Sequence, residues 1–202
     1  MSAPINSEFD IRGVNHLALV CKDMARTVEF YRDVLGMPLV KTIDLPQGMG
    51  QHFFFDIGNN DCLAFFWFPG APDVAPGISS PAALPGEGPI ATAHGSMNHI
   101  AFDVPANRFD EYCERLRSKG VKLSPVMNHD NSPMQVSAKM HPGVFVRSVY
   151  FFDPDGVCLE FASWTQAFTD ADVAHDPMTA DGTLAKGVVV GRSAAKEHAP
   201  AE

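Results

Sequence analysis

Gly13-Val-Asn-His-Leu-Ala-Leu-Val20 is repeated, in modified form, as Ser96-Met-Asn-His-Ile-Ala-Phe-Asp103. A second pair of similar stretches follows in the same order: Asp61-Cys-Leu-Ala-Phe65 and Val157-Cys-Leu-Glu-Phe161. Two such matches predict a duplicated unit of about seventy residues, because a repeat in sequence marks a repeated piece of structure. We therefore expect two copies of one module in this chain.

Each copy has the hydrophobic pattern of a strand, a helix and then three strands, which makes the fold class α+β. In the first copy the strands are expected at 14–20, 39–44, 50–56 and 62–68. In the second copy they are expected at 97–104, 121–127, 144–152 and 157–164. Asp23 is the expected N-cap of the first helix, and Gly36 and Gly120 are expected to end the two helices.

The expected organisation has five parts: an N-terminal arm at 1–10, the first module at 11–68, a Pro/Gly-rich loop at 69–95, the second module at 96–165 and an irregular tail at 166–202. Within the tail, Val188–Val190 is expected to pack across a neighbouring surface.

Composition narrows the possible partners and the location. The 202 residues are 46% hydrophobic and 19% charged, as in an ordinary globular chain. A net charge of −9 without a basic stripe argues against nucleic acid, and no apolar run has the length of a membrane span. The first ten residues lack a secretory pattern and the four cysteines are widely spaced, so we expect reduced thiols and a cytoplasmic location.

Three predicted strands share one chemical pattern. One face carries a metal-capable side chain with an alanine two residues away, and the other face carries large apolar side chains. The pairs are His16 and Ala18, His99 and Ala101, and Glu160 and Ala162. A lone strand histidine is more often a core or surface residue than a ligand, but a repeated one favours a metal site. Two imidazoles and a carboxylate are a donor set for Fe(II) or Mn(II).

With these residues and motifs, the chain from 11 to 164 resembles the vicinal oxygen chelate superfamily, which includes glyoxalases, antibiotic resistance proteins and extradiol dioxygenases. The resemblance implies paired βαβββ modules that form a curled sheet around a metal-binding cavity. It also implies that His16, His99 and Glu160 are the metal ligands. Ala64 stands where glyoxalase-type lyases have a fourth ligand, and alanine cannot coordinate a metal.

The stretch from His141 to Glu160 resembles the extradiol ring-cleavage signature, with His141, Tyr150 and Glu160 spaced by nine and ten residues. The resemblance implies a dioxygenase that cleaves a catechol-like aromatic diol with O2 and uses Fe(II), with Mn(II) as the second choice. Tyr150 would donate a hydrogen bond to the reacting oxygens, and His141 would be a donor near the cavity. We further expect a homodimer or a higher homo-oligomer.

Two departures and two alternatives accompany this interpretation. Lys139 replaces a small or apolar residue of the signature, and Asp61 occupies the place of the acid/base histidine, where we expect a proton shuttle. Arg147 is a candidate partner for a substrate carboxylate. A glyoxalase-like lyase or isomerase remains open, as does a resistance-type protein that only sequesters its ligand. Aromatic residues between 53 and 68 are expected to divide between the core and a pocket.

Overall fold

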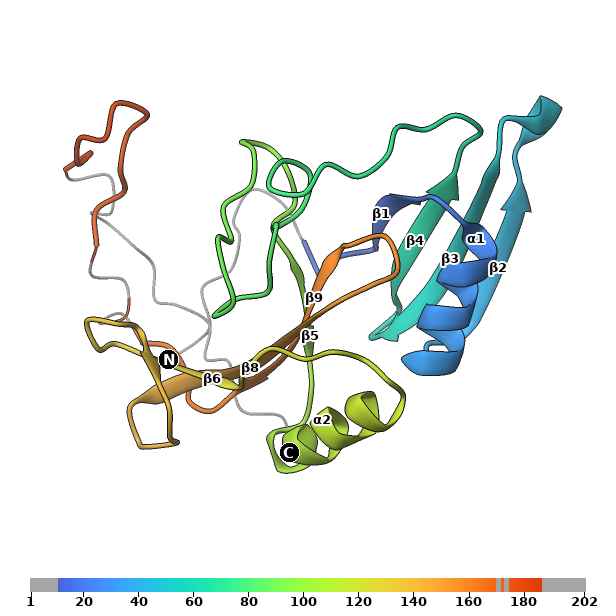
Figure 1. Ribbon diagram of the computed structural model, residues 1–202. Helices are drawn as coiled ribbons and strands as arrows, with labels where there is room; N and C mark the ends of the chain where they lie inside the picture. The colour runs from blue at the N-terminus through green and yellow to red at the C-terminus, as the bar shows by residue number, and fades with distance from the viewer. Residues whose placement is uncertain (1–10, 170–171, 173–174, 187–202) are drawn as a thin grey trace.

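The computed structural model describes residues 11–169, 172 and 175–186, which form two mixed β-sheets, each with one long helical segment (Figure 1). The first sheet has the strand order β1 (His16–Cys21), β4 (Asp61–Trp67), β3 (Gln51–Gly58) and β2 (Leu39–Asp44). The second has the order β5 (Ile100–Asp103), β9 (Cys158–Trp164), β8 (Val144–Phe152), β6 (Met127–Asp130) and β7 (Val136–Ser137). In both sheets the first strand of the module pairs in parallel with the last of its long strands.

Most predicted strands are confirmed, and two of them, Leu39–Asp44 and Val144–Phe152, have the predicted bounds. The strand predicted at 121–127 is wrong, because the observed strand β6 begins only at Met127. Upstream, Ser124 exchanges hydrogen bonds with the backbone of Tyr150, and the next residue, Pro125, has no N–H to continue a ladder.

The helix of the first module starts and stops where the sequence predicts. The Asp23 carboxylate accepts from the Arg26 backbone N–H at 3.1 Å, and α1 (Met24–Val28) continues as a π-helical segment, Glu29–Val34. Gly36 follows with a φ of 77°, a left-handed conformation that costs glycine little. In the second module α2 (Phe109–Ser118) is preceded by a 3-10 turn, Ala106–Arg108.

The two modules share one hydrophobic core. Tyr31, Phe55 and Phe65 from the first module are buried with Phe151 and Leu159 from the second. These side chains belong to the faces of the sheets that the helices cover. Because alternate residues of a strand point to opposite faces, the faces that carry His16 and His99 look away from the shared core.

A buried hydrogen bond joins the modules. The Tyr31 hydroxyl donates to Asp153 Oδ2 at 3.0 Å, while the backbone N–H groups of Asp155 and Val157 donate to Asp153 Oδ1. Burial raises the pKa of Asp153 to about 6, against the opposing effect of these hydrogen bonds. The folded chain therefore holds a proton on Asp153 up to a higher pH than the unfolded chain does.

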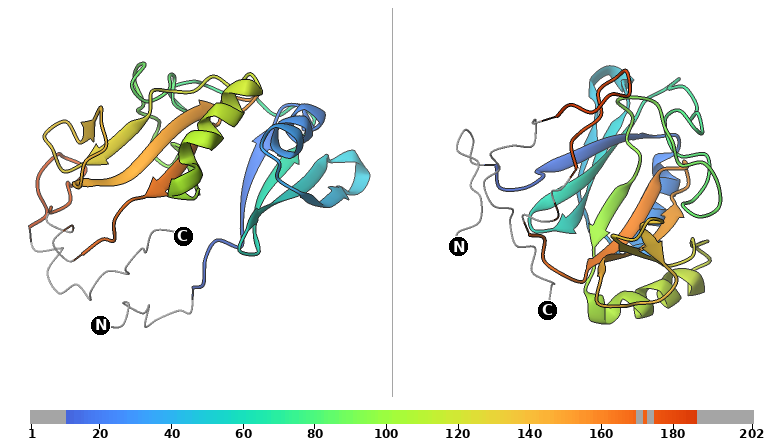
Figure 2. Two further views of the ribbon diagram at one scale, coloured as in Figure 1. Left: turned by 90° about the horizontal axis from the view of Figure 1, so that it is seen from below. Right: turned by 90° about the vertical axis from the view of Figure 1, so that its left-hand side faces the viewer.

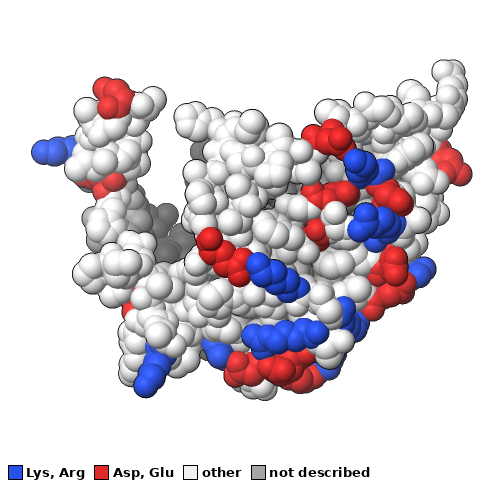
Figure 3. Space-filling view, viewed as in Figure 1, with Lys and Arg blue, Asp and Glu red and all other residues white. Residues whose placement is uncertain are grey.

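The remaining described segments are irregular. The segment 69–95 has no strand or helix beyond a bridge between Pro76 and Ser80, and it crosses from the first sheet to the second (Figures 1 and 2). Figure 3 shows acidic and basic side chains interspersed over α1 and α2. Within the described part of the chain, no helix is long and apolar enough to cross a membrane. The predicted packing of Val188–Val190 falls outside the described residues.

Asp153→Asn is expected to change the pH dependence of stability. Because the pKa of Asp153 is raised on folding, ionising it disfavours the folded state as pH rises from about 4 to above 6. The asparagine Oδ1 keeps both backbone hydrogen bonds and carries no charge. The unfolding free energy of the variant, relative to wild type, should thus rise by up to about 3 kcal/mol between pH 4 and pH 7. Urea unfolding at both pH values measures this, and a pH-independent difference would contradict it.

Candidate metal site

His99, Glu160 and Tyr150 lie together on the face of the second sheet that α2 does not cover. In the register of β8 and β9, Tyr150 is the direct partner of Glu160, as their predicted placement on one face requires. His99 precedes β5, and its Nε2 lies 3.1 Å from Glu160 Oε2. The Tyr150 ring stands edge-to-face against the His99 ring, with a centroid distance of 5.7 Å.

The His99 imidazole is oriented by the asparagine before it. Asn98 donates through Nδ2 to the carbonyl of Ile90 at 2.7 Å, so its Oδ1 is the atom that faces His99 Nδ1 at 2.9 Å. An amide oxygen only accepts hydrogen bonds, so His99 Nδ1 donates to it and Nε2 is the atom turned toward Glu160. A hydrogen on Nε2 would make this contact a hydrogen bond to the carboxylate, and a cation bound by both atoms would take the place of that hydrogen. A divalent metal fits this place, and the asparagine is the outer partner that a metal-binding histidine usually has.

The side chains around Glu160 favour an ionised carboxylate and a neutral phenol. Burial alone would raise the pKa of Glu160, but the hydrogen bond from His99 and the nearby hydroxyls of Ser148 and Tyr150 lower it. Burial raises the pKa of Tyr150 far above its usual value, and the negative charge of Glu160 raises it further. Tyr150 is therefore a hydrogen-bond donor at neutral pH and not an anionic ligand.

His16 repeats this construction on the first sheet. Asn15 Oδ1 lies 2.8 Å from His16 Nδ1, which again leaves Nε2 free. The side chain is exposed on the face of β1 that also carries Ala18. Within one chain, however, the described residues contain no group of three His, Cys, Asp or Glu side chains placed to hold a metal. The predicted triad is thus divided between the two sheets, with two members together and His16 apart.

His141 belongs to a different cluster. Its Nε2 donates to buried Asp130 at 2.9 Å and lies 3.2 Å from the Ser137 hydroxyl, while its Nδ1 accepts from the Gly143 N–H. Hydrogen bonds from Ser132, Ser137 and His141 hold the pKa of Asp130 far below its usual value. The cluster precedes β8, whereas Tyr150 lies near the other end of that strand, so the structure does not bring His141 to Glu160.

The structure does not support the roles expected of Asp61 and Arg147. The pairing of β1 with β4 puts Cys62 beside His16, so Asp61, one residue earlier, belongs to the opposite side of the strand. Arg147 has the opposite parity to Tyr150 and lies on the α2 side. There it makes two hydrogen bonds to Asp110, at 3.0 and 2.7 Å, and its guanidinium lies 4.5 Å from the Phe109 ring centroid.

Two neighbours of the site were missed in the sequence. Leu84, from the irregular segment, packs against Tyr150 and Cys158 and covers part of the His99 face. His52 shares the His16 face and stacks on Phe66 with a centroid distance of 3.6 Å. Leu84 has no periodic context that would have flagged it, but the alternation of β3 could have placed His52 on the face of Phe54.

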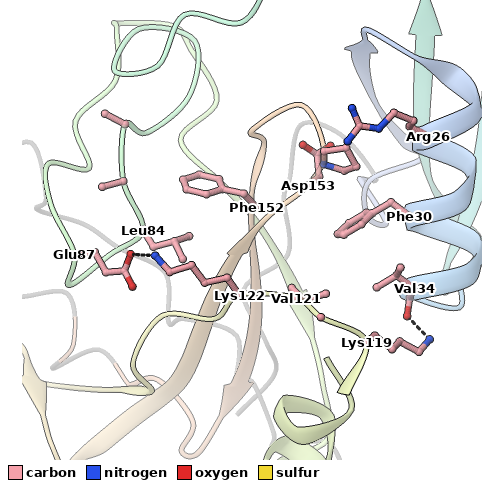
Figure 4. A pocket seen from close by; sticks show the side chains of 14 residues that line it. Arg26, Phe30, Val34, Leu84, Glu87, Lys119, Val121, Lys122, Phe152 and Asp153 are labelled. Carbon is pink, nitrogen blue, oxygen red and sulfur yellow. Dashed lines mark hydrogen bonds and ion pairs between the residues drawn. The ribbon is translucent and has the colours of Figure 1, made fainter. Parts of the chain in front are cut away.

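A hollow of about 460 Å³ lies elsewhere, where the two modules meet (Figure 4). It is lined by Arg26 and Phe30 from the first module, by Phe152 from β8, and by the ion pair of Lys122 with Glu87, whose atoms are 2.6 Å apart. None of the predicted site residues lines it. The hollow shares Leu84 with the surroundings of Tyr150 but does not contain the predicted ligands.

Comparison with known proteins agrees with the fold described above. Residues 13–161 match the Glyoxalase/Bleomycin resistance protein/Dioxygenase superfamily. The chain belongs to this superfamily. The match spans both sheets and all three predicted ligands, and it confirms the resemblance seen in the sequence.

Among characterised members of the superfamily, the chain is 25% identical to the fosfomycin resistance protein FosX of Listeria innocua over 156 residues, which cover 77% of this chain and 92% of the relative. It is 26% identical to the metallothiol transferase FosB of Shouchella clausii over 175 residues, 86% of this chain and 93% of the relative. It is 28% identical to the putative ring-cleaving dioxygenase MhqE of Bacillus subtilis over 115 residues. That match covers 55% of this chain but only 33% of the relative.

Solved structures of the superfamily share the fold. A glyoxalase family protein from Enterococcus faecalis superposes with a TM-score of 0.54 at 20% identity, covering 76% of this chain and 99% of that one. A monoclinic form of FosX from Listeria monocytogenes gives a TM-score of 0.50 at 20% identity, covering 77% and 95%. These similarities confirm the predicted α+β architecture.

Arg147→Met is expected to reduce stability and to leave ligand binding unchanged, because this side chain packs on the helix side of the sheet. The cation–π contact with Phe109 is partly buried, whereas the paired Asp110 is exposed, so we expect a loss of about 1 kcal/mol. Arg117→Met is the control, because this exposed residue of α2 pairs with the exposed Glu114, and it should change stability by less than about 0.5 kcal/mol. Thermal unfolding measures both, and equal effects would contradict the assigned role.

Proposed function

We propose that this protein is a metal-dependent enzyme that cleaves the ring of an aromatic vicinal diol with O2. The metal, Fe(II) first and Mn(II) second, is held by His99 and Glu160 of one copy of the chain and by His16 of a second copy. The observation that carries the proposal is the open His99–Glu160 pair, with protonated Tyr150 beside it, on a sheet face that His16 does not reach within the same chain.

The donor set fits a divalent cation. In both modules an asparagine oxygen orients the histidine so that Nε2 is free, and Glu160 is ionised beside His99. Imidazole and carboxylate donors suit Fe(II) and Mn(II) better than a thiolate-preferring metal. The name of the relative FosB, a metallothiol transferase, agrees with metal chemistry on this fold.

A second copy supplies the missing ligand most simply. The shared core turns the His16 face and the His99 face outward, so neither can close on the other inside one chain. A two-fold dimer places the same two surfaces against each other twice, which would give two equivalent sites. This accounts for the exposure of both histidines in one chain.

Mixing two inactive variants tests the shared site. His16→Ala and Glu160→Ala homodimers should each bind no metal, because each loses one ligand from both sites. A heterodimer of the two, co-expressed with different tags, has one site with both defects and one intact site. It should therefore hold about half of the wild-type metal content. A metal-free heterodimer, or failure of the two tags to co-purify, would contradict a site shared between copies.

A divalent metal held by His99 and Glu160 of one copy and His16 of a second would supply Lewis acidity, which lowers the pKa of a chelating diol. The chain's own residues orient the ligands and donate a hydrogen bond to the substrate. Asn15 and Asn98 fix the imidazoles, Glu160 supplies the negative charge, and the Tyr150 hydroxyl donates to an oxygen of the bound substrate. Leu84 packs over Tyr150 and helps to exclude water from this hydroxyl.

The charge of the site favours a diol over a strongly anionic ligand. The described strands carry two Lys or Arg side chains: Arg147, which faces α2, and Lys41 of β2, which pairs with Phe54 on the His16 face. A phosphonate such as fosfomycin is usually held by several cationic side chains, which these strands do not offer. Epoxide opening remains the second candidate, because the relatives FosX and FosB match nearly their whole length.

Oxygen uptake distinguishes these functions. Protein reconstituted anaerobically with Fe(II) should consume O2 when given catechols, and Tyr150→Phe should lower turnover about 10- to 1,000-fold with unchanged metal content. The variant keeps the ring contact with His99, so its melting temperature should stay close to wild type. No O2 uptake with any catechol, combined with turnover of fosfomycin, would replace the first proposal by the second. Full activity of Tyr150→Phe would remove Tyr150 from the mechanism.

A further inference from the structure

Five aromatic rings form a continuous file on the open face of the first sheet, and the file begins at His16. The centroid distances are 5.8 Å from His16 to Phe54, 4.2 Å from Phe54 to His52, 3.6 Å from His52 to Phe66 and 5.1 Å from Phe66 to Phe68. The last two pairs are nearly parallel, with interplanar angles of 18° and 12°. We refer to Phe54, His52, Phe66 and Phe68 as the ring file.

The strand register creates the ring file. His52 pairs with Phe66 across β3 and β4, so the two rings stack side by side on one face. Phe53 and Phe55 have the opposite parity and pack into the shared core with Tyr31. The predicted assignment of part of these aromatic residues to the core is therefore confirmed for β3, where neighbouring phenylalanines point to opposite faces.

The ring file is a partly exposed apolar surface, which is unfavourable in water unless a ligand or another protein surface covers it. Its rings are half-buried, Phe68 is 37% exposed, and Val20 beside it on β1 is 51% exposed. Most solvated sheet faces carry polar residues, whereas this one carries aromatic rings next to a candidate metal ligand. His52 Nε2 is buried and has no hydrogen-bond partner in the described part of the chain, so this ring adds apolar and not polar surface to the ring file.

We propose that the ring file is an apolar platform whose ring edges select substrates with a planar aromatic group extending beyond the metal-chelating oxygens. This proposal rests on the proposed metal site at His16. Phe54 is next to His16 and would contact the ring that carries the two oxygens. His52 and Phe66 lie farther along the file and would contact a second ring, fused or linked to the first.

This geometry separates ligand classes that the metal alone does not separate. A single-ring diol reaches only the Phe54 end, a two-ring diol also covers His52 and Phe66, and a small aliphatic diol or phosphonate covers none of the rings. Ring-on-ring contacts are worth enough to change affinity about 2- to 10-fold each. The protein should therefore prefer two-ring diols.

Ligand binding without turnover tests the platform. Metal-loaded protein is titrated anaerobically with naphthalene-2,3-diol and with catechol, and wild type should bind the naphthalene diol at least several-fold more tightly. Phe66→Leu should weaken the binding of the naphthalene diol about 3- to 10-fold and leave the affinity for catechol nearly unchanged. Phe54→Leu should weaken the binding of both diols. Phe53→Leu, the adjacent residue with the same change on the core side, is the matched control: it should lower the melting temperature and leave both affinities unchanged.

Several results would overturn the proposal. They are equal effects of Phe54→Leu and Phe53→Leu on affinity, no preference of wild type for the two-ring diol, or no binding of either diol. Conversion of Phe66→Leu to a monomer would instead assign the ring file to the contact between copies. Retained two-ring preference in a protein that holds metal but consumes no O2 would support this proposal while the dioxygenase proposal fails.

Discussion

Tyr31 is fully buried between the two modules, and its hydroxyl donates to Asp153 at the start of the turn between β8 and β9. The backbone N–H of Lys22 donates to Asp155 in the same turn at 2.9 Å. These two hydrogen bonds therefore attach the first module to the hairpin that carries Tyr150 and Glu160. The contact between the modules also buries the helix-side face of each sheet. Only the opposite face of each sheet then remains on the outside. Both histidines are consequently left on the outside, so the proposed metal site is incomplete within a single chain.

Much of this could be predicted from the sequence, because period-two alternation determines which side chains share a face. It placed His99 with Glu160, Tyr150 with Glu160, and each histidine beside a small alanine. Alternation within one strand contains no information about how two modules pack, so the separation of His16 could not be predicted. His141 and Arg147 show the same limit at shorter range. A linear spacing from a signature predicted a shared cavity, but the turn before β8 and the parity of position 147 direct these side chains elsewhere.

The electrostatics of the second sheet explain why His99 and Glu160 act as a pair. Glu160 is 5% exposed and its pKa is nevertheless lowered, so the folded protein keeps a buried negative charge. Such a charge is costly unless a cation or strong donors face it. With Nδ1 of His99 engaged by Asn98, only a proton or a metal at Nε2 can supply that cation. The loop that covers the site takes part directly, because the Ile90 carbonyl sets the orientation of the Asn98 amide.

The first sheet has the same strand pattern but different side chains around its histidine. Glu160 has its counterpart at Ala64, so His16 faces no carboxylate on its own sheet and is surrounded by rings instead. In the proposed site, one module contributes charge and hydrogen-bond donors, and the other contributes an imidazole and an apolar platform. A chelating aromatic diol also has two parts: oxygens that would bind the metal and a ring that would contact an apolar surface. After duplication, each copy of the module can specialise in one half of the ligand. Joining the halves between two chains then requires only that both faces stay open in each chain.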